Sequence, residues 1–251
     1  MIPTGTGAGP GPVRIGVTLP TFREDAVAVD GARRAEALGL DGVFVFDHLW
    51  PMGQPERPAL AAFPVLGALA VATGRVALGP LVARIGLVPD EVMIGRFRAL
   101  EVLAPGRVIA GLGTGDTKSA PENAAYGVPV DAPGARRRSL AECAGTLVGE
   151  GVPVWIGGGA PATVAVAAAV GAAVNLWDAA PEALTAEAGR TEVTWGGPVP
   201  ADADGIVARL APLVAAGATW VVCAWPRSVE AVAEAAAELR RRPVGGVVAG
   251  E

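Results

Sequence analysis

The segment Val43-Phe44-Val45-Phe46-Asp47-His48-Leu49-Trp50-Pro51 (VFVFDHLWP) carries the signal that decides the fold. Its first four residues are β-branched or aromatic and follow Gly42, so the pattern predicts a buried strand over 43–46. An acid, the only histidine of the chain and a tryptophan come directly after it. Parallel α/β proteins place their chemistry at the carboxyl ends of strands. Asp47 and His48 are therefore candidates for function.

The same alternation of a short apolar strand with a helical segment repeats along the chain. The pattern predicts strands over 13–19, 43–46, 75–83, 107–112, 153–156, 173–176, 191–195 and 220–224. It predicts helices over 25–38, 59–72, 90–103, 135–148, 161–170, 181–188, 204–216 and 228–241, with a long polar loop over 113–134. Eight strand–helix units in about 250 residues favour a (β/α)8 TIM barrel, with a doubly wound sheet as the second possibility. We expect a loose Gly/Pro-rich tail over 1–12 and a single domain over 13–251.

The composition excludes several classes of protein. The 251 residues are 51% hydrophobic, and the net charge of −5 argues against nucleic acid or an anionic membrane as partner. The longest uncharged stretch, 160–177, is interrupted by Pro161, Gly171 and Asn175, which favours a helix and a strand over a membrane span. Two distant cysteines indicate a reducing compartment. We expect a soluble cytoplasmic protein, and its alanine- and valine-rich helices favour a homodimer.

His48 admits two interpretations. A lone histidine can simply be satisfied by hydrogen bonds at the rim of a barrel. Its position after Asp47 at a strand end favours a functional role, because an imidazole exchanges protons near neutral pH. No G-x-S-x-G motif is present for a serine triad, and no His/Cys/Asp cluster has metal-ligand spacing.

Two glycine-rich segments follow predicted strands. The first, Gly111–Asp116 (GLGTGD), does not open a helix at once and so fails as a dinucleotide fingerprint. Its glycines either let a flat ligand lie against the backbone or serve a turn with positive φ. The second, Gly157–Pro161 (GGGAP), precedes a predicted helix whose free amides favour a phosphate. Arg84 is a further candidate for an anionic ligand, or else a solvated arginine at the rim.

Four tryptophans lie in or just after predicted strands, namely Trp50, Trp155, Trp177 and Trp195. Core packing explains such positions, and so does a pocket for a large planar ligand. We place Trp50 in a substrate pocket and Trp177 beside a cofactor.

Several segments in this order resemble the luciferase-like monooxygenase superfamily. They are DGVFVFDHLWP (41–51), RVALGPLVAR (75–84), PGRVIAGLGTGD (105–116) with ENAAYGVP (122–129), and PVWIGGGAPAT (153–163) with NLWD (175–178). The nearest resemblance is to the branch that uses coenzyme F-420 (8-hydroxy-5-deazaflavin; F420 in protein names). It implies a (β/α)8 barrel with the ring at the carboxyl ends of the strands, where Asp47 and His48 contact the ring or the transferred proton.

The resemblance also implies a cofactor site. Leu81-Val82 matches a bulge behind the ring that often contains a non-prolyl cis peptide. Loop contacts and phosphate contacts follow further along the chain. Together with the residues above, the cofactor-binding candidates are Leu81, Val82, Arg84, Gly113, Thr114, Gly115, Asn123, Gly157, Gly158, Gly159 and Trp177.

Two features depart from the family pattern. Relatives carry an excursion between the helix after the fourth strand and the fifth strand, whereas only 149–152 connects them here, a shortened insertion. Several relatives use lysine near the phosphate, but the only lysine is Lys118.

The resulting expectation is a flavin- or deazaflavin-dependent oxidoreductase that moves a hydride between the cofactor and a small organic substrate. His48 would exchange a proton with the reacting partner, and Asp47 would orient His48. Coenzyme F-420 is favoured over FMN. The alternatives are an FMN-dependent monooxygenase, a degenerate non-catalytic flavin-binding barrel and, more distantly, a phosphosugar enzyme.

Overall fold

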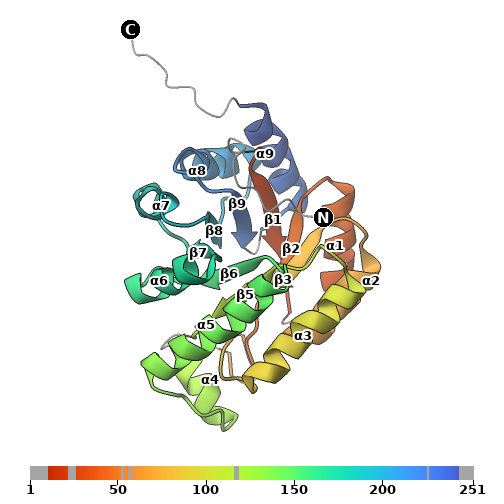
Figure 1. Cartoon of the computed structure of the whole chain (residues 1–251). Coiled ribbons are helices and arrows are strands. Elements are labelled where there is room, and N and C mark those ends of the chain that lie inside the picture. Colours follow the sequence, from red (N-terminus) through yellow and green to blue (C-terminus); the bar gives the residue numbers. More distant parts are fainter. Residues whose placement is uncertain are drawn as a thin grey trace.

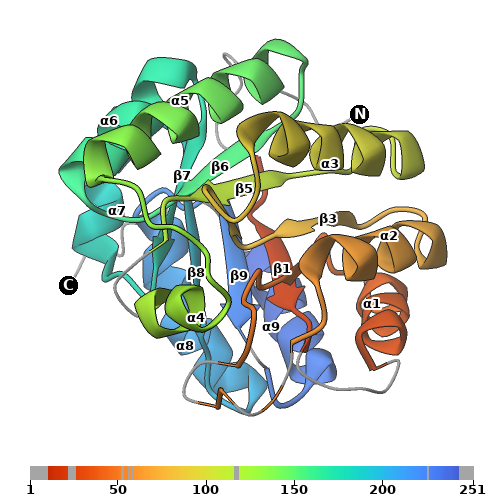
Figure 2. The same cartoon turned by 90° about the horizontal axis from the view of Figure 1, so that it is seen from below.

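The computed structural model describes residues 11–21, 27–51, 54–55, 57, 59–115, 119–224 and 226–242. The expected tail at 1–12 lies outside the described residues as far as residue 10, and so does Lys118. Within the described part, parallel strands form a nearly closed barrel with helices outside it (Figures 1 and 2). This confirms the expected α/β barrel.

The barrel wall is a single parallel sheet in the order β3-β2-β1-β9-β8-β7-β6-β5-β4. Its strands are β1 (Arg14–Thr18), β2 (Gly42–Val45), β3 (Ala77–Pro80), β4 (Ala83–Arg84), β5 (Ala110–Gly113), β6 (Val154–Gly157), β7 (Ala173–Trp177), β8 (Val193–Pro198) and β9 (Trp220–Ala224). Strands β3 and β4 occupy one position of the barrel in succession, because β3 pairs with β2 and β4 pairs with β5.

The barrel closes along a seam between β3 and β5. A parallel bridge joins Leu78 to Val108, and the amide of Leu78 donates to the carbonyl of Arg107 at 2.9 Å. A Cβ on Gly79 would lie 2.0 Å from the carbonyl oxygen of Ile109, so only glycine fits this close approach. The seam therefore depends on glycine as much as on hydrogen bonds.

Helices surround the strands in the end-on view of Figure 2. They are α1 (Val27–Ala37), α2 (Ala62–Ala72), α3 (Asp90–Leu103), α4 (Ala120–Ala125), α5 (Pro133–Gly149), α6 (Pro161–Val170), α7 (Pro181–Ala188), α8 (Ala203–Ala215) and α9 (Val229–Arg241). The expected cap of α9 is present, because the Ser228 hydroxyl accepts from the amide of Ala231. No helix in the described residues is both long and apolar enough to cross a membrane.

Two differences from the sequence prediction go beyond a shift of a few residues in the bounds of an element. The strand expected over 75–83 is interrupted at Leu81-Val82, whose peptide bond is cis as the resemblance implies. The loop expected over 113–134 contains helix α4, which has Pro121 in its first turn together with Glu122. A proline and an acid in the first turn are both signals for the start of a helix, but the polar composition of this segment favours a loop prediction. Figure 1 shows α4 at one end of the barrel, beyond the end of α5.

An aromatic layer fills the middle of the barrel. The ring of Phe44 stacks on Trp155 with centroids 5.1 Å apart, and Trp155 meets Trp220 edge-on at 5.3 Å. Gly16 and Gly42 make room for it, because a Cβ on either would lie 2.9 Å from an aromatic ring atom. Such pairs add roughly 0.5–1.5 kcal/mol each beyond their burial. The layer forms a solid floor, so a ligand enters from the carboxyl ends of the strands.

Candidate active site

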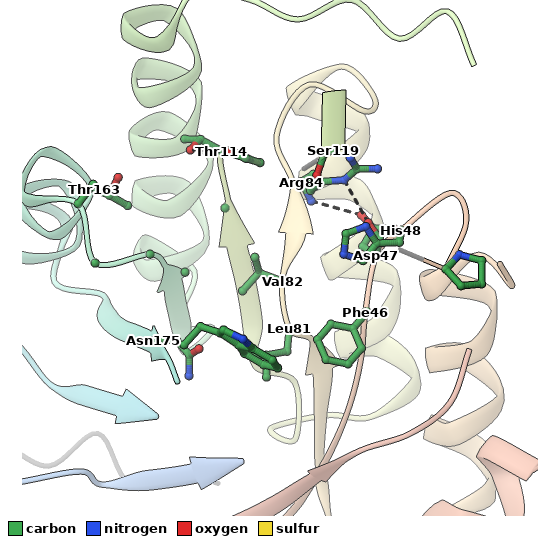
Figure 3. Close-up of a pocket in the computed structure, with 18 of the residues that line it drawn as sticks. Phe46, Asp47, His48, Leu81, Val82, Arg84, Thr114, Ser119, Thr163 and Asn175 are labelled. Carbon is green, nitrogen blue, oxygen red and sulfur yellow. Dashed lines mark hydrogen bonds between the residues drawn. The ribbon is translucent and has the colours of Figure 1, made fainter. Parts of the chain in front are cut away.

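A cavity of about 810 Å³ opens at the carboxyl ends of the strands (Figure 3). Its volume is in the range of small-molecule and cofactor sites. It is lined by Phe46, Asp47, His48, Pro51, Gln54, Leu81, Val82, Arg84, Gly113, Thr114, Gly115, Ser119, Gly157, Gly158, Gly159, Ala160, Thr163, Asn175 and Trp177. Most of the residues predicted for the site are therefore brought together in one cavity.

Arg84 is the centre of a buried polar network on one side of the cavity. Only 5% of the residue is exposed, and its guanidinium forms an ion pair with Glu122 of α4, which is 1% exposed. Its Nη1 donates to the Asn123 amide oxygen and its Nε to the Asp47 carbonyl, both at 3.1 Å. Arg84 thus ties β4, the end of β2 and α4 together, and is not a solvated arginine at the rim.

His48 is held by the same carboxylate. Its Nδ1 lies 3.1 Å from Glu122 Oε2, while Glu122 Oε1 accepts from the amide of Leu49 at 2.6 Å. The Glu122 carboxylate forms an ion pair with Arg84, and a carboxylate in an ion pair accepts hydrogen bonds but has no hydrogen to donate. Nδ1 of His48 therefore carries the hydrogen in this bond. The other ring nitrogen, Nε2, is then left for a ligand in the cavity.

Asp47 has a different partner from the one that we expect from the sequence. Its Oδ2 accepts from the backbone amide of Arg84 at 3.3 Å, and His48 donates to Glu122 instead of to Asp47. Burial raises the pKa of the Asp47 carboxyl, and the Arg84 amide and the charges of Arg84 and Arg96 offset this only in part.

The opposite side of the cavity is built from glycines that make room for Val82. A Cβ on Gly113 would lie 2.6 Å from a Val82 methyl, and one on Gly157 would lie 3.0 Å away. Gly158 has φ of +125°, a conformation that favours glycine, and its amide donates to the Asn175 carbonyl at 3.1 Å. Packing against Val82 is thus a sufficient reason for glycine at positions 113 and 157.

The N-terminus of α6 also faces the cavity. Ala160 is the N-cap, no side chain caps the helix, and Pro161 begins it. Among the described residues, the amides of Gly159 and Ala160 form no hydrogen bond. Amides of this kind at a helix start attract an anion.

The other predicted residues lie in different surroundings. Trp177 lines the cavity, is 43% exposed and meets Phe46 edge-on with centroids 5.6 Å apart. Trp50 is not among the lining residues and packs against Tyr126 with centroids 5.8 Å apart. Asn123 does not line the cavity either, and its side-chain oxygen serves Arg84.

Glu122 is a functional candidate that the sequence reasoning missed, as is Asn175 of the cavity lining. The signal for Glu122 was present, since it stands in a Pro-Glu helix start within the matched segment ENAAYGVP. Within the described part of the chain, no three His, Cys, Asp or Glu side chains are grouped so as to hold a metal ion.

Comparison with known proteins places the chain in a family. Residues 12–145, more than half of the 251 residues, match the luciferase-like monooxygenase family. The chain belongs to this family, as the motifs predict.

Among curated proteins, the F420-dependent glucose-6-phosphate dehydrogenase of Beutenbergia cavernae is 45% identical over 84 residues, 33% of this chain and 25% of that protein. The protein of the same name from Nakamurella multipartita is 38% identical over 112 residues, 43% of this chain and 32% of that protein. The matches thus span about a quarter to a third of the length of these relatives.

Solved structures share the fold along most of the chain. An F420-dependent secondary alcohol dehydrogenase in complex with an F420-acetone adduct has a TM-score of 0.75 at 16% identity, covering 91% of this chain and 98% of that chain. The coenzyme F420-dependent tetrahydromethanopterin reductase from Methanopyrus kandleri has a TM-score of 0.71 at 15% identity, covering 90% and 97%. The FMN complex of the oxygenating constituent of 3,6-diketocamphane monooxygenase from Pseudomonas putida has a TM-score of 0.59 at 12% identity, covering 79% and 71%.

Proposed function

We propose that this protein is an oxidoreductase that binds coenzyme F-420 and serves hydride transfer between it and a small organic substrate. The observation that carries the proposal is the Arg84–Glu122–His48 network beside a cofactor-sized cavity in a member of this family. The curated relatives are named as F420-dependent enzymes, which favours coenzyme F-420 over FMN.

The cavity fits the two parts of such a coenzyme. A flat ring needs an apolar surface, which Leu81, Val82 and the exposed ring of Trp177 provide. An anionic tail needs hydrogen-bond donors, and the amides of Gly159 and Ala160 at the start of α6 supply them without a lysine. These residues would hold the ring and the phosphate, respectively.

The proton chemistry falls to His48. When bound, the deazaflavin accepts or supplies the hydride. The His48 imidazole can take the hydroxyl proton of an alcohol as its carbon loses the hydride and becomes a carbonyl, and return that proton in the reverse direction. Glu122 holds the ring of His48 in place through Nδ1, and Arg84 fixes Glu122.

Two alternatives remain as hypotheses. An FMN-dependent monooxygenase is favoured by the family description and by the fold shared with an FMN-bound monooxygenase. A non-catalytic flavin-binding barrel is favoured by the short connection from α5 to β6, which spans residues 150–153. The homodimer expected from the sequence stays a prediction that sedimentation equilibrium measures directly.

Titration of the purified protein with coenzyme F-420 and with FMN tests the proposal. We expect a saturable change in coenzyme F-420 absorbance and fluorescence, and a weaker one or none with FMN. Preference for FMN with oxygen consumption supports the monooxygenase instead, and binding without turnover of alcohols or sugar phosphates supports the non-catalytic barrel. Absence of binding by either coenzyme overturns the proposal.

A further inference from the structure

We propose that Asn175 presents its amide oxygen to the cavity as a fixed hydrogen-bond acceptor for an N–H or O–H group of the bound coenzyme. The inference rests on the proposed function and adds to it a residue that fixes which way round the coenzyme lies. Asn175 stands on β7, lines the cavity and is only 3% exposed.

A hydrogen-bond relay behind the cavity sets the orientation of this amide. Asn175 Nδ2 donates to the Thr194 hydroxyl at 2.9 Å, and that hydroxyl donates to the carbonyl oxygen of Val174 at 3.2 Å. A threonine hydroxyl has one hydrogen, so Thr194 can only accept from Asn175. The amide nitrogen must therefore face Thr194, which is fully buried.

The amide oxygen of Asn175 is then left to the cavity. It forms no hydrogen bond with any described residue, and it is not among the buried side-chain atoms that lack a partner. It is thus accessible from the cavity that Asn175 lines. A nearly buried amide oxygen is costly to leave without a donor, so a ligand group that fills this part of the cavity must offer one.

The surroundings select a donor and reject an anion. Trp177 follows two residues further along β7, and a Cβ on Gly196, which pairs with Trp177, would be 3.3 Å from both Leu81 and Trp177. In such apolar surroundings an acceptor repels a phosphate, and the phosphate prefers the start of α6. Figure 3 shows Asn175 and Thr163 on one side of the cavity and His48 and Arg84 on the other.

Two parts of the coenzyme have the required chemistry. The ring of a flavin or deazaflavin carries an imide N–H between two carbonyls, and the deazaflavin ring also carries the 8-hydroxyl. The ribityl chain carries further hydroxyls. Each of these groups can donate to Asn175, and the shared requirement is one hydrogen on nitrogen or oxygen. Binding to Asn175 at one end and to the start of α6 at the other leaves the coenzyme a single orientation.

A cycle of protein and ligand changes tests the proposal. Asn175→Leu keeps the size of the side chain and removes the acceptor, while Thr194→Val keeps the acceptor and removes its anchor. The ligands are coenzyme F-420, its 10-methyl ring fragment without the ribityl chain, and that fragment methylated at N3. Dissociation constants come from fluorescence titration, so the readout does not depend on turnover.

We expect Asn175→Leu to weaken binding of coenzyme F-420 by about tenfold. If the imide is the donor, the variant weakens the ring fragment equally and leaves its N3-methyl form unchanged. If the 8-hydroxyl is the donor, both ring fragments are weakened equally. If a ribityl hydroxyl is the donor, only the complete coenzyme is affected. We expect Thr194→Val to weaken binding of coenzyme F-420 several-fold, because the side-chain amide of Asn175 is then free to rotate.

Equal affinities of wild type and Asn175→Leu for coenzyme F-420 overturn the acceptor role. If Asn175→Leu fails to fold, Asn175→Ala, which removes the acceptor without adding bulk, takes its place in the cycle. A wild-type protein that binds no flavin or deazaflavin overturns the proposed function and this inference with it. A wild type that binds while the variants bind equally well overturns this inference alone.

Discussion

The two sides of the cavity are built in opposite ways. The charged wall consists of Asp47, His48 and Arg84 together with Glu122, which does not line the cavity but holds Arg84 and His48 through an ion pair and a hydrogen bond. The glycine wall consists of Gly113 and Gly157–Gly159, which present backbone to the cavity, and Gly113 and Gly157 also leave room for Val82. One wall is specified by side-chain chemistry and the other by the absence of side chains. Changes to the charged wall should therefore alter reactivity and charge balance, and changes to the glycine wall should alter fit.

The largest expected effect is the loss of the histidine from the charged wall. We expect His48→Ala to lower turnover by about 10²–10⁴-fold, because a positioned general acid or base contributes that much. Coenzyme affinity should change little, since the glycine wall is intact. Steady-state kinetics and a binding titration on the same preparation measure both. Unaltered turnover would remove His48 from the mechanism.

The second effect concerns stability. Arg84→Met should destabilise the fold by about 3–5 kcal/mol, because it leaves the buried Glu122 carboxylate without its cation. Urea unfolding measures this. The double variant Arg84→Met with Glu122→Gln should recover much of the loss, since position 122 then carries no charge that needs a cation. A double variant less stable than either single one would contradict the ion-pair explanation.

A smaller effect is expected on the glycine wall. Gly113→Ala would place a methyl 2.6 Å from Val82, so we expect a loss of about 1–3 kcal/mol in unfolding free energy. Adding Val82→Ala should relieve it. Gly149→Ala on α5 is the matched control, because nothing lies within 4 Å of its added Cβ. If both glycine variants lose equal stability, contact with Val82 is not the cause.

The smallest effect is a pH dependence from Asp47. Its pKa is raised in the folded protein by burial, so the folded state holds this proton more tightly than the unfolded state. The contribution of Asp47 to stability is then fully present below the unfolded pKa and is lost as pH rises through the folded pKa. The stability of Asp47→Asn relative to wild type should accordingly increase between pH 4 and pH 7 in urea unfolding experiments. A constant difference across that range would contradict the raised pKa.

The same contrast explains what the sequence could reveal. Periodicity predicted the barrel, and three helices, 90–103, 161–170 and 181–188, have the bounds that we expect from it. The glycine wall could also be predicted, because runs of glycine after predicted strands can be recognised in the sequence. The bounds of β9 at 220–224 agree as well.

Only half of the charged wall could be predicted from the sequence. Asp47 and His48 follow a strand and stand out, but their partners are distant in the sequence. Arg84 is 37 residues from Asp47, and Glu122 is a further 38 residues from Arg84. Which carboxylate faces a histidine depends on how α4 folds back over the barrel, and no local pattern encodes that. The short α4 was hidden because six residues are too few for a helical period to show.

The seam between β3 and β5 has a consequence for where the barrel opens locally. It is the place where one bridge, Leu78 to Val108, and a close approach at Gly79 replace a full ladder of hydrogen bonds. Regions with few backbone hydrogen bonds open at low free energy. Amides beside the seam should thus exchange with solvent deuterium before those between β8 and β9. Because Val82 and Gly113 connect this region to the cavity, a bound coenzyme should slow exchange at the seam more than anywhere else in the barrel.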